Sequence, residues 1–115
     1  MNIKAYSFIF AGIMLLGSIL RIHALGENPP GFFCDEASVW YNAYTITHHG
    51  TDEYGTKFPI FFQAFGEYKS PIQIYSTVPF IVLFGLNEFS TRLPSAIYGV
   101  LGIFAIFILT RELFR

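Results

Sequence analysis

Two uncharged apolar runs that have a basic residue at each end, 5–20 and 93–110, most constrain how this chain can fold. Both runs are closed by basic residues, which are Lys4, Arg21, Arg92 and Arg111. A helix of about 17–25 apolar residues crosses a bilayer, and flanking lysine and arginine side chains reach the headgroups. The sequence therefore predicts transmembrane helices at about 5–25 and 91–113.

The composition agrees with a membrane protein. Of the 115 residues, 53% are hydrophobic and only 13% are charged, whereas soluble domains carry about 25% charged residues. The net charge of -1 and the lack of a basic cluster argue against a nucleic-acid partner. A single cysteine, Cys34, allows neither an internal disulfide nor a thiolate zinc site. We therefore expect an all-α integral membrane protein.

Local signals support a helix in both runs. A cleaved signal peptide also has a basic residue before an apolar core, but the single Lys4 and the long core favour a retained span. For the second span, Ser90 or Thr91 is expected to cap the N-terminus, with Pro94 in the first turn.

The apolar segment 70–84, SPIQIYSTVPFIVLF, is harder to place. As a helix it would reach about 22 Å, short of the roughly 30 Å hydrocarbon core, and Pro79 lies in its interior. Two spans would leave both basic ends of the chain in the cytoplasm, whereas a third would force Arg111 outside. We therefore expect two spans joined by an extracytoplasmic loop, 26–88, with three spans as the alternative.

The chain begins with Met1 and stops just beyond the second apolar run. A chain of this length supplies only two or three spans and a loop. We therefore expect residues 1–115 to be the N-terminal transmembrane fragment of a larger multispan protein.

The predicted loop contains a turn followed by a helix at about 35–49, because the prolines and glycine of ENPPGFF resist helix formation. Polar residues at spacings of three and four share one face of this helix: Asp35, Ser38, Asn42, Thr45 and His49. Apolar residues share the opposite face: Val39, Ala43 and Ile46, with Trp40 alongside. An amphipathic helix of this kind suits the membrane surface. We therefore expect two interfacial helices, at about 35–49 and 70–84.

Asp35 and Glu36 stand side by side where the first of these helices begins. One interpretation makes Asp35 the N-cap and Glu36 a first-turn acid that favours the helix dipole. One carboxylate would suffice for capping, however, and charge near the membrane is costly and usually functional. The other interpretation is a carboxylate that accepts a proton from a hydroxyl group.

The remaining acidic and histidine residues give weaker signals. Asp52 and Glu53 lie between two glycines in GTDEYG, which predicts an exposed turn. His48 and His49 would point about 100° apart on a helix. A divalent metal site made from these histidines and the carboxylates therefore has little support.

Lys69 precedes the start of the second interfacial helix, where Ser70 is a good N-cap and Pro71 fits the first helical position. A cation beside a helix N-terminus favours an anion such as phosphate. The alternative is a lysine that only reaches to the membrane interface. A proton-accepting carboxylate and a phosphate-binding lysine on one loop are what a lipid-phosphate group transferase needs.

The order of these motifs resembles a known family. PPGFFCDEASVWYNAY, the Lys69-Ser70-Pro71 helix start and FGLNEFSTRLPSA are similar to the N-terminal part of polytopic family 39 glycosyltransferases, which have the C-type fold. This group contains the dolichyl-phosphate-mannose protein mannosyltransferases and the bacterial aminoarabinose-lipid A transferases. The resemblance covers nearly the whole chain.

The resemblance implies an inverting enzyme that transfers a sugar from a polyprenyl-phosphate donor to a hydroxyl of a protein, lipid or glycan acceptor. Asp35 would be the general base, and Glu36 would assist it or orient the acceptor. Lys69 would bind the donor phosphate, with Arg92 as a further donor-side candidate whose individual role is unassigned. The loop would be extracytoplasmic in a multi-pass protein of the cell membrane, completed by the remaining transmembrane helices.

Two departures from the family pattern bear on the acceptor. Relatives often have two prolines after the lysine, where this chain has Ser70-Pro71, and the aminoarabinose transferases carry a basic residue where this chain has Ser38. The second change puts a lipid A acceptor in doubt. The fragment alone is expected to be inactive.

Two other classes of function stay open at this level. The chain could belong to a secondary transporter in which Asp35 is a proton or ion site, although such a charge is expected inside a broken span. It could also be a membrane scaffold whose loop is a docking surface.

Overall fold

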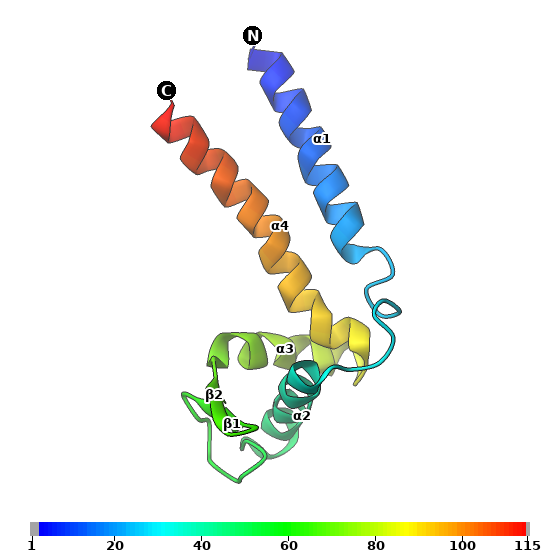
Figure 1. The fold of residues 1–115 in the computed structure, drawn as a ribbon, viewed down its shortest axis with the longest axis vertical. Helices are drawn as coiled ribbons and strands as arrows, with labels where there is room; N and C mark the ends of the chain where they lie inside the picture. Colours follow the sequence, from blue (N-terminus) through cyan, green and yellow to red (C-terminus); the bar gives the residue numbers. More distant parts are fainter. Residues whose placement is uncertain (1–2, 115) are drawn as a thin grey trace. The chain divides into compact units, whose positions relative to one another are not determined.

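The computed structural model describes residues 3–114, with side chains from residue 6 onward. The elements follow in the order α1 (Ile3–Ile22), α2 (Cys34–His49), β1 (Phe62–Ala64), β2 (Glu67–Lys69), α3 (Pro71–Phe84) and α4 (Glu88–Leu113) (Figure 1). The chain is therefore mostly helical, as expected, but the all-α prediction missed a short hairpin. The side chains of Lys4 and Arg115 are not among those that the structure describes.

The chain divides into two compact units. One unit, called the loop unit here, comprises Ala24–Pro94. The other combines the chain up to His23 with the chain from Ser95 onward, so α4 begins in the loop unit and continues in the other.

Among the described residues, α4 is the one helix long and apolar enough to cross a membrane, judged by its length and composition. Two apolar helical segments are shorter: α3, and the part of α1 whose side chains are described, Tyr6–Ile22. With 14 residues, α3 reaches about 21 Å, which is less than the hydrocarbon core. The two-span topology therefore remains a prediction, and the length of α3 speaks against a third span.

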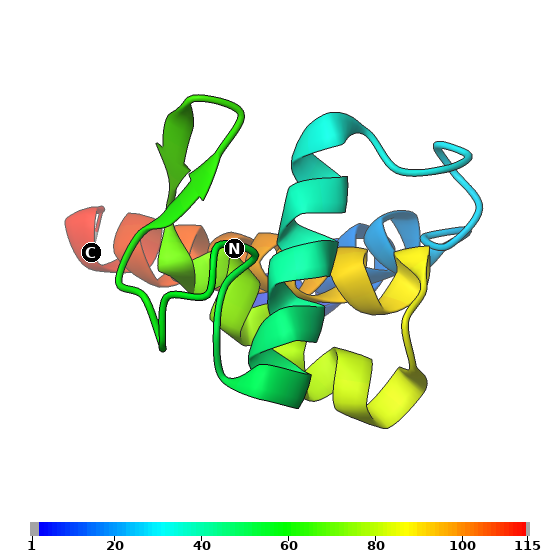
Figure 2. The same cartoon turned by 90° about the horizontal axis from the view of Figure 1, so that it is seen from below.

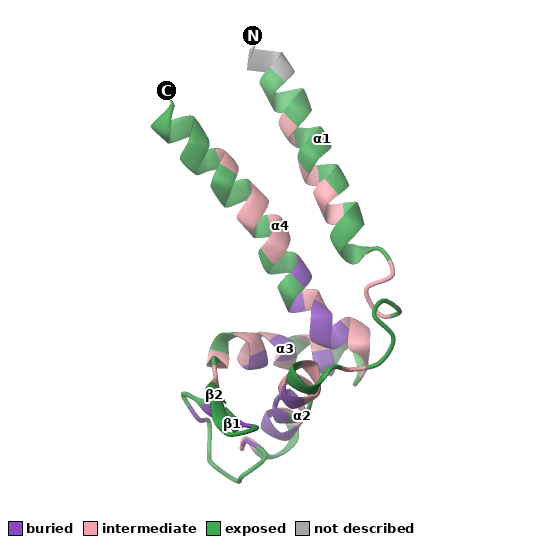
Figure 3. Ribbon diagram, in the orientation of Figure 1, coloured by how far each residue is buried: buried purple, intermediate pink, exposed green. Residues whose placement is uncertain are grey.

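The unit formed by α1 and the later part of α4 is held by close helix contacts. The ring of Phe10 stacks on that of Phe107, with centroids 3.8 Å apart. Gly17 and Gly99 make room for side chains of the facing helix, because a Cβ at either position would overlap Ile103 or Arg21. Most large apolar side chains of both helices remain exposed (Figure 3).

The start of α4 differs from the expected one. The helix begins at Glu88, and Asn87 caps it in place of Ser90 or Thr91: the Ser90 amide donates to Asn87 Oδ1 (2.9 Å) and the Asn87 amide donates to Ser90 Oγ (3.3 Å). Because the helix starts earlier, Pro94 lies inside it and not in its first turn.

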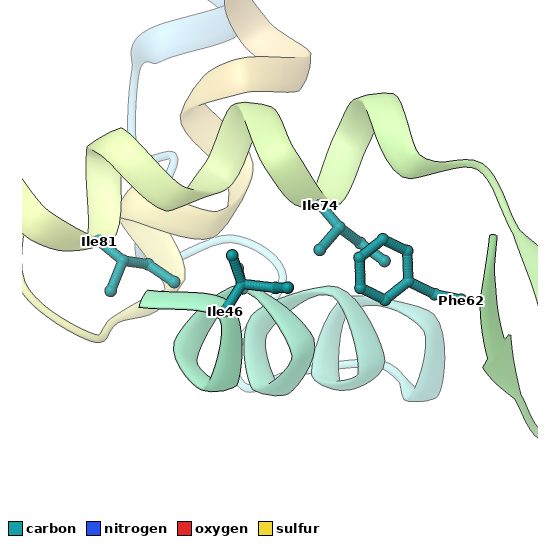
Figure 4. Close-up of a cluster of buried hydrophobic side chains, with 5 residues drawn as sticks. Ile46, Phe62, Ile74 and Ile81 are labelled. Atoms are coloured by element: carbon teal, nitrogen blue, oxygen red, sulfur yellow. The ribbon is translucent and has the colours of Figure 1, made fainter. Parts of the chain in front are cut away.

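The core of the loop unit lies between α2, α3 and β1. Ile46 projects from α2 toward Ile74 and Ile81 of α3, and Phe62 of β1 packs beside Ile74 (Figure 4). Phe62 and Ile74 are fully buried. Truncating a buried side chain of this size costs about 2–5 kcal/mol, so this cluster fixes α3 and the hairpin to α2.

A tight turn joins the two strands (Figure 2). The register pairs Phe62 with Lys69 and Ala64 with Glu67, which leaves Phe65 and Gly66 as a two-residue connection. Both have positive φ, 51° and 84°, as a type I′ hairpin turn requires. The turn was missed because a bulky residue seldom occupies the first of these positions.

The polar face of α2 is buried, contrary to the expectation of an amphipathic helix lying on a surface. Ser38, Asn42 and Thr45 are at most 7% exposed. The side-chain amide of Asn42 donates from Nδ2 to Glu53 Oε1 (3.1 Å), and its Oδ1 accepts from the Glu53 backbone N–H (3.1 Å). The segment after α2 therefore folds back over this face.

The predicted exposed turn at GTDEYG is also partly wrong. Asp52 is 6% exposed, and its Oδ1 accepts hydrogen bonds from the backbone N–H groups of Tyr54 (3.0 Å) and Thr56 (2.7 Å). A carboxylate used in this way shapes the turn, while Glu53 and Tyr54 remain on the surface.

Candidate functional site

Asp35 and Lys69, 34 positions apart in sequence, meet in the loop unit. Lys69 Nζ donates to Asp35 Oδ1 at 2.6 Å. Asp35 comes from the first turn of α2, and Lys69 is the last residue of β2, two residues before α3. The core contacts between these elements therefore bring together the two residues that the sequence assigned to proton transfer and phosphate binding.

The pair is accessible from outside the loop unit. The Asp35 side chain is 62% exposed and the Lys69 side chain 18% exposed. A proton acceptor and a cation in this setting can both be reached by a ligand.

Glu67 is a third member of this cluster that the sequence did not predict. Lys69 Nζ also donates to Glu67 Oε1. The two residues are separated by one position on β2, so their side chains leave the same face of the strand. The alternation in GEYKSP was the available signal, but it has meaning only once the segment is known to be a strand.

Glu36, the neighbour of Asp35, has an entirely different partner. Arg92 donates from Nε to Glu36 Oε1 (2.9 Å) and from Nη2 to Glu36 Oε2 (3.0 Å), which is a bidentate ion pair. The same guanidinium donates to the backbone oxygens of Leu25 (3.0 Å) and Gly31 (2.7 Å). We call this arrangement the Arg92 clamp.

The Arg92 clamp joins three parts of the loop unit. It holds the turn before α2, the first turn of α2 and the start of α4 around one side chain, which is only 7% exposed. Four of the five N–H groups of Arg92 are thus bonded within the protein. The family resemblance grouped Arg92 with Lys69 on the donor side, whereas in the structure Arg92 contacts Glu36.

The first turn of α2 explains how the two carboxylates are used locally. The N-cap is Phe33, which has no polar side-chain atom, and the Phe33 amide donates to Glu36 Oε2 (3.4 Å). One interpretation of the sequence made Asp35 the N-cap, and the structure shows that this is wrong. Glu36 accepts the backbone N–H of the N-cap residue, a contact in which Asp35 takes no part.

Each of the two carboxylates faces a different basic side chain. The Arg92 guanidinium holds the pKa of Glu36 below its usual range, through hydrogen bonds that outweigh desolvation. Hydrogen bonds to Asp35 and then to Glu67 raise the pKa of Lys69, so the ammonium stays charged at neutral pH. Asp35, Glu67 and Lys69 together carry a charge of -1, counted from two carboxylates and one ammonium.

The start of α3 lies next to Lys69. Ser70 is the N-cap and Pro71 takes the first helical position, as expected, but the Ser70 hydroxyl makes no capping hydrogen bond. The helix therefore keeps backbone N–H groups without a side-chain cap close to the lysine.

The described residues contain no group of three or more His, Cys, Asp or Glu side chains that could hold a metal ion. His48 and His49 are exposed, and His48 Nδ1 lies 3.0 Å from the Tyr44 carbonyl oxygen. Neither histidine has a contact with the Asp35 cluster among the interactions of the described chain.

Comparisons of the chain with protein-family models, curated proteins and solved structures gave no match.

Proposed function

We propose that this chain is the N-terminal part of a multi-pass membrane glycosyltransferase that uses a polyprenyl-phosphate sugar as donor. The observation that carries the proposal is the 2.6 Å contact between Asp35 and Lys69. It joins a proton acceptor to a cation beside a helix N-terminus, which are the two groups that sugar transfer from a lipid phosphate demands.

The proposed reaction is a single displacement. The Asp35 carboxylate takes the proton of the acceptor hydroxyl, whose oxygen then forms a bond to the anomeric carbon. The bond between that carbon and the phosphate oxygen breaks with inversion, and its electron pair leaves with the polyprenyl phosphate. Lys69 stabilises the charge on the leaving phosphate. The acceptor hydroxyl belongs to a protein, a lipid or a glycan.

Glu36 and Arg92 are positioning residues in this proposal. Their bidentate pair fixes the first turn of α2 and hence the backbone from which Asp35 projects. Misplacing a catalytic group by about 1 Å can cost about 100-fold in rate, so the clamp supports the reaction without touching the substrate.

The proposed location of the loop unit is the extracytoplasmic side of the cell membrane, between spans formed by α1 and α4. A transporter with Asp35 as its ion site is less well supported. Asp35 lies in the first turn of α2, outside α4, which is the described helix long enough to span, whereas a transport carboxylate is expected near the membrane midplane. No described contact favours the scaffold alternative.

The test is sugar transfer by the complete membrane enzyme, using a polyprenyl-phosphate sugar and a hydroxyl acceptor. We expect Asp35→Asn to abolish transfer while membrane insertion is unchanged, and Lys69→Ala mainly to raise the KM for the donor. Glu27→Gln, which removes an exposed carboxylate of the same unit, is the control. Normal transfer by Asp35→Asn would refute the role of Asp35 as base.

Topology is tested separately with cysteine labelling. Leu86→Cys, made together with Cys34→Ser because Cys34 is exposed, should react only with reagents supplied outside the cell. Labelling from the cytoplasm would mean that α3 crosses the membrane.

A further inference from the structure

We propose that Glu67 is a displaceable anion that occupies Lys69 until the donor phosphate binds. The inference rests on the proposed function and adds a residue that determines donor affinity. In the structure Lys69 Nζ donates to two carboxylates, Asp35 and Glu67, so two of its three N–H groups are engaged, and a phosphate that takes more than one of them has to displace a carboxylate.

Glu67 is the partner better suited to leave. Its side chain is 64% exposed, and its ion pair with Lys69 joins two residues of the same short strand. Losing this pair therefore leaves the contact between β2 and α2 in place. The Asp35 contact, in contrast, joins two elements. Exposed ion pairs contribute little to stability, so a phosphate can replace Glu67 at small cost.

Charge gives the reason why the replacement affects affinity. With Glu67 in place, the cluster carries -1 (two carboxylates and one ammonium) and repels an incoming phosphate ester. When Glu67 turns away, Lys69 faces Asp35 and the phosphate. The repulsion between the Glu67 carboxylate and the phosphate then falls because the distance between them grows. A chain without the charge at position 67 should therefore bind the phosphate more tightly. The Coulomb energy between one carboxylate and the phosphate at a solvated site corresponds to about a fivefold change in Kd.

The experiment measures binding of undecaprenyl phosphate to the 115-residue chain in nanodiscs of zwitterionic lipid, by native mass spectrometry. Glu67→Gln is compared with the wild type, with Lys69→Gln and with Glu27→Gln, which makes the same charge change at another exposed position. We expect Glu67→Gln to lower the Kd, Lys69→Gln to raise it and Glu27→Gln to leave it unchanged. Inorganic phosphate, titrated in parallel, should bind far more weakly than the lipid.

The outcomes separate this inference from the proposed function. If Lys69→Gln weakens binding but Glu67→Gln binds like the wild type or more weakly, the role of Glu67 is wrong and that of Lys69 stands. If Lys69→Gln binds as the wild type does, the donor-binding role of Lys69 fails as well. Equal gains for Glu67→Gln and Glu27→Gln would reduce the effect to net charge and overturn the inference. Equal affinity for inorganic phosphate would show that the ligand is free phosphate rather than a lipid donor.

A charge-preserving variant completes the test. Glu67→Asp keeps the charge but shortens the side chain, so it should reach Lys69 less well and give a Kd between those of the wild type and Glu67→Gln. A purely structural role of Glu67 would instead predict that Glu67→Gln weakens binding and that Glu67→Asp restores it.

Discussion

Asp35 and Glu36 are consecutive residues of α2, but their side chains lie in different surroundings. The Asp35 side chain is 62% exposed and meets a lysine that a second carboxylate also contacts. The Glu36 side chain is 31% exposed and is held at both oxygens by an arginine that is itself 7% exposed. The Asp35 carboxylate is open to solvent, while the Glu36 carboxylate is bonded within the fold.

This contrast gives a reason for two consecutive carboxylates at the start of α2. Glu36 accepts hydrogen bonds from the Phe33 backbone N–H and from the Arg92 guanidinium, and Asp35 makes neither contact. A residue released from capping and from the core can exchange partners. The pair of Glu36 and Arg92 should therefore matter for folding, and the pair of Asp35 and Lys69 for binding and chemistry.

The largest expected effect on stability comes from breaking the Arg92 clamp. Arg92→Ala leaves Glu36 and two backbone oxygens without their donor, and losing one partner of a buried pair costs about 3–5 kcal/mol. Because Glu36 is partly exposed, we expect the lower end, about 3 kcal/mol. The measurement is urea unfolding in detergent micelles, followed by the fluorescence of Trp40, the single tryptophan of the chain.

Arg111→Ala is the matched control for this variant. It removes an exposed arginine near the other end of α4 and should change the free energy of unfolding little. If both variants lose the same stability, Arg92 is not the clamp that its hydrogen bonds suggest.

A smaller effect is expected from Glu36→Gln, which keeps the shape of the side chain and removes its charge. Hydrogen bonds to charged groups contribute about 1.5–3 kcal/mol, and the amide oxygen still accepts one of them, so a loss of about 1–2 kcal/mol follows. The double variant with Arg92→Ala should be no less stable than Arg92→Ala alone. Strictly additive losses would mean that the two side chains do not act as a pair.

The free energy of unfolding should depend on pH because of the ion pair between Glu36 and Arg92. The pKa of Glu36 is below its usual range because of Arg92, so its stabilising contribution is complete above the usual glutamate pKa of about 4.3. It is lost as the pH falls through the lower pKa of the folded state. Wild type and Glu36→Gln should therefore converge in stability on acidification from pH 6, and parallel curves would contradict the assignment.

The helices of the loop unit were largely predictable from sequence. The helix expected at about 35–49 is Cys34–His49, and that expected at about 70–84 is Pro71–Phe84. Gly50 and Gly85 end them with positive φ, at 67° and 79°, and Pro71 starts the second. These signals are local, which is why they can be read without knowing what the helices touch.

What could not be predicted depends on contacts between distant segments. Periodicity placed Ser38 and Asn42 on one face of α2, but the cover for that face comes from Glu53 in the following turn. The hairpin has Phe65 where asparagine or glycine usually signals the turn. Without the hairpin, Glu67 has no predicted orientation, and the direct contact between Lys69 and Asp35 cannot be foreseen.

The smallest expected effect on stability is that of Asp35→Asn. Asp35 is mostly exposed, does not cap α2 and pairs with a lysine that keeps Glu67 as a second partner. Exposed pairs contribute little, so unfolding followed by Trp40 fluorescence should coincide with that of the wild type. Together with lost sugar transfer, this result would place the effect of Asp35 in the reaction. A clear loss of stability in Asp35→Asn would instead give both carboxylates a structural role, and the contrast between them would disappear.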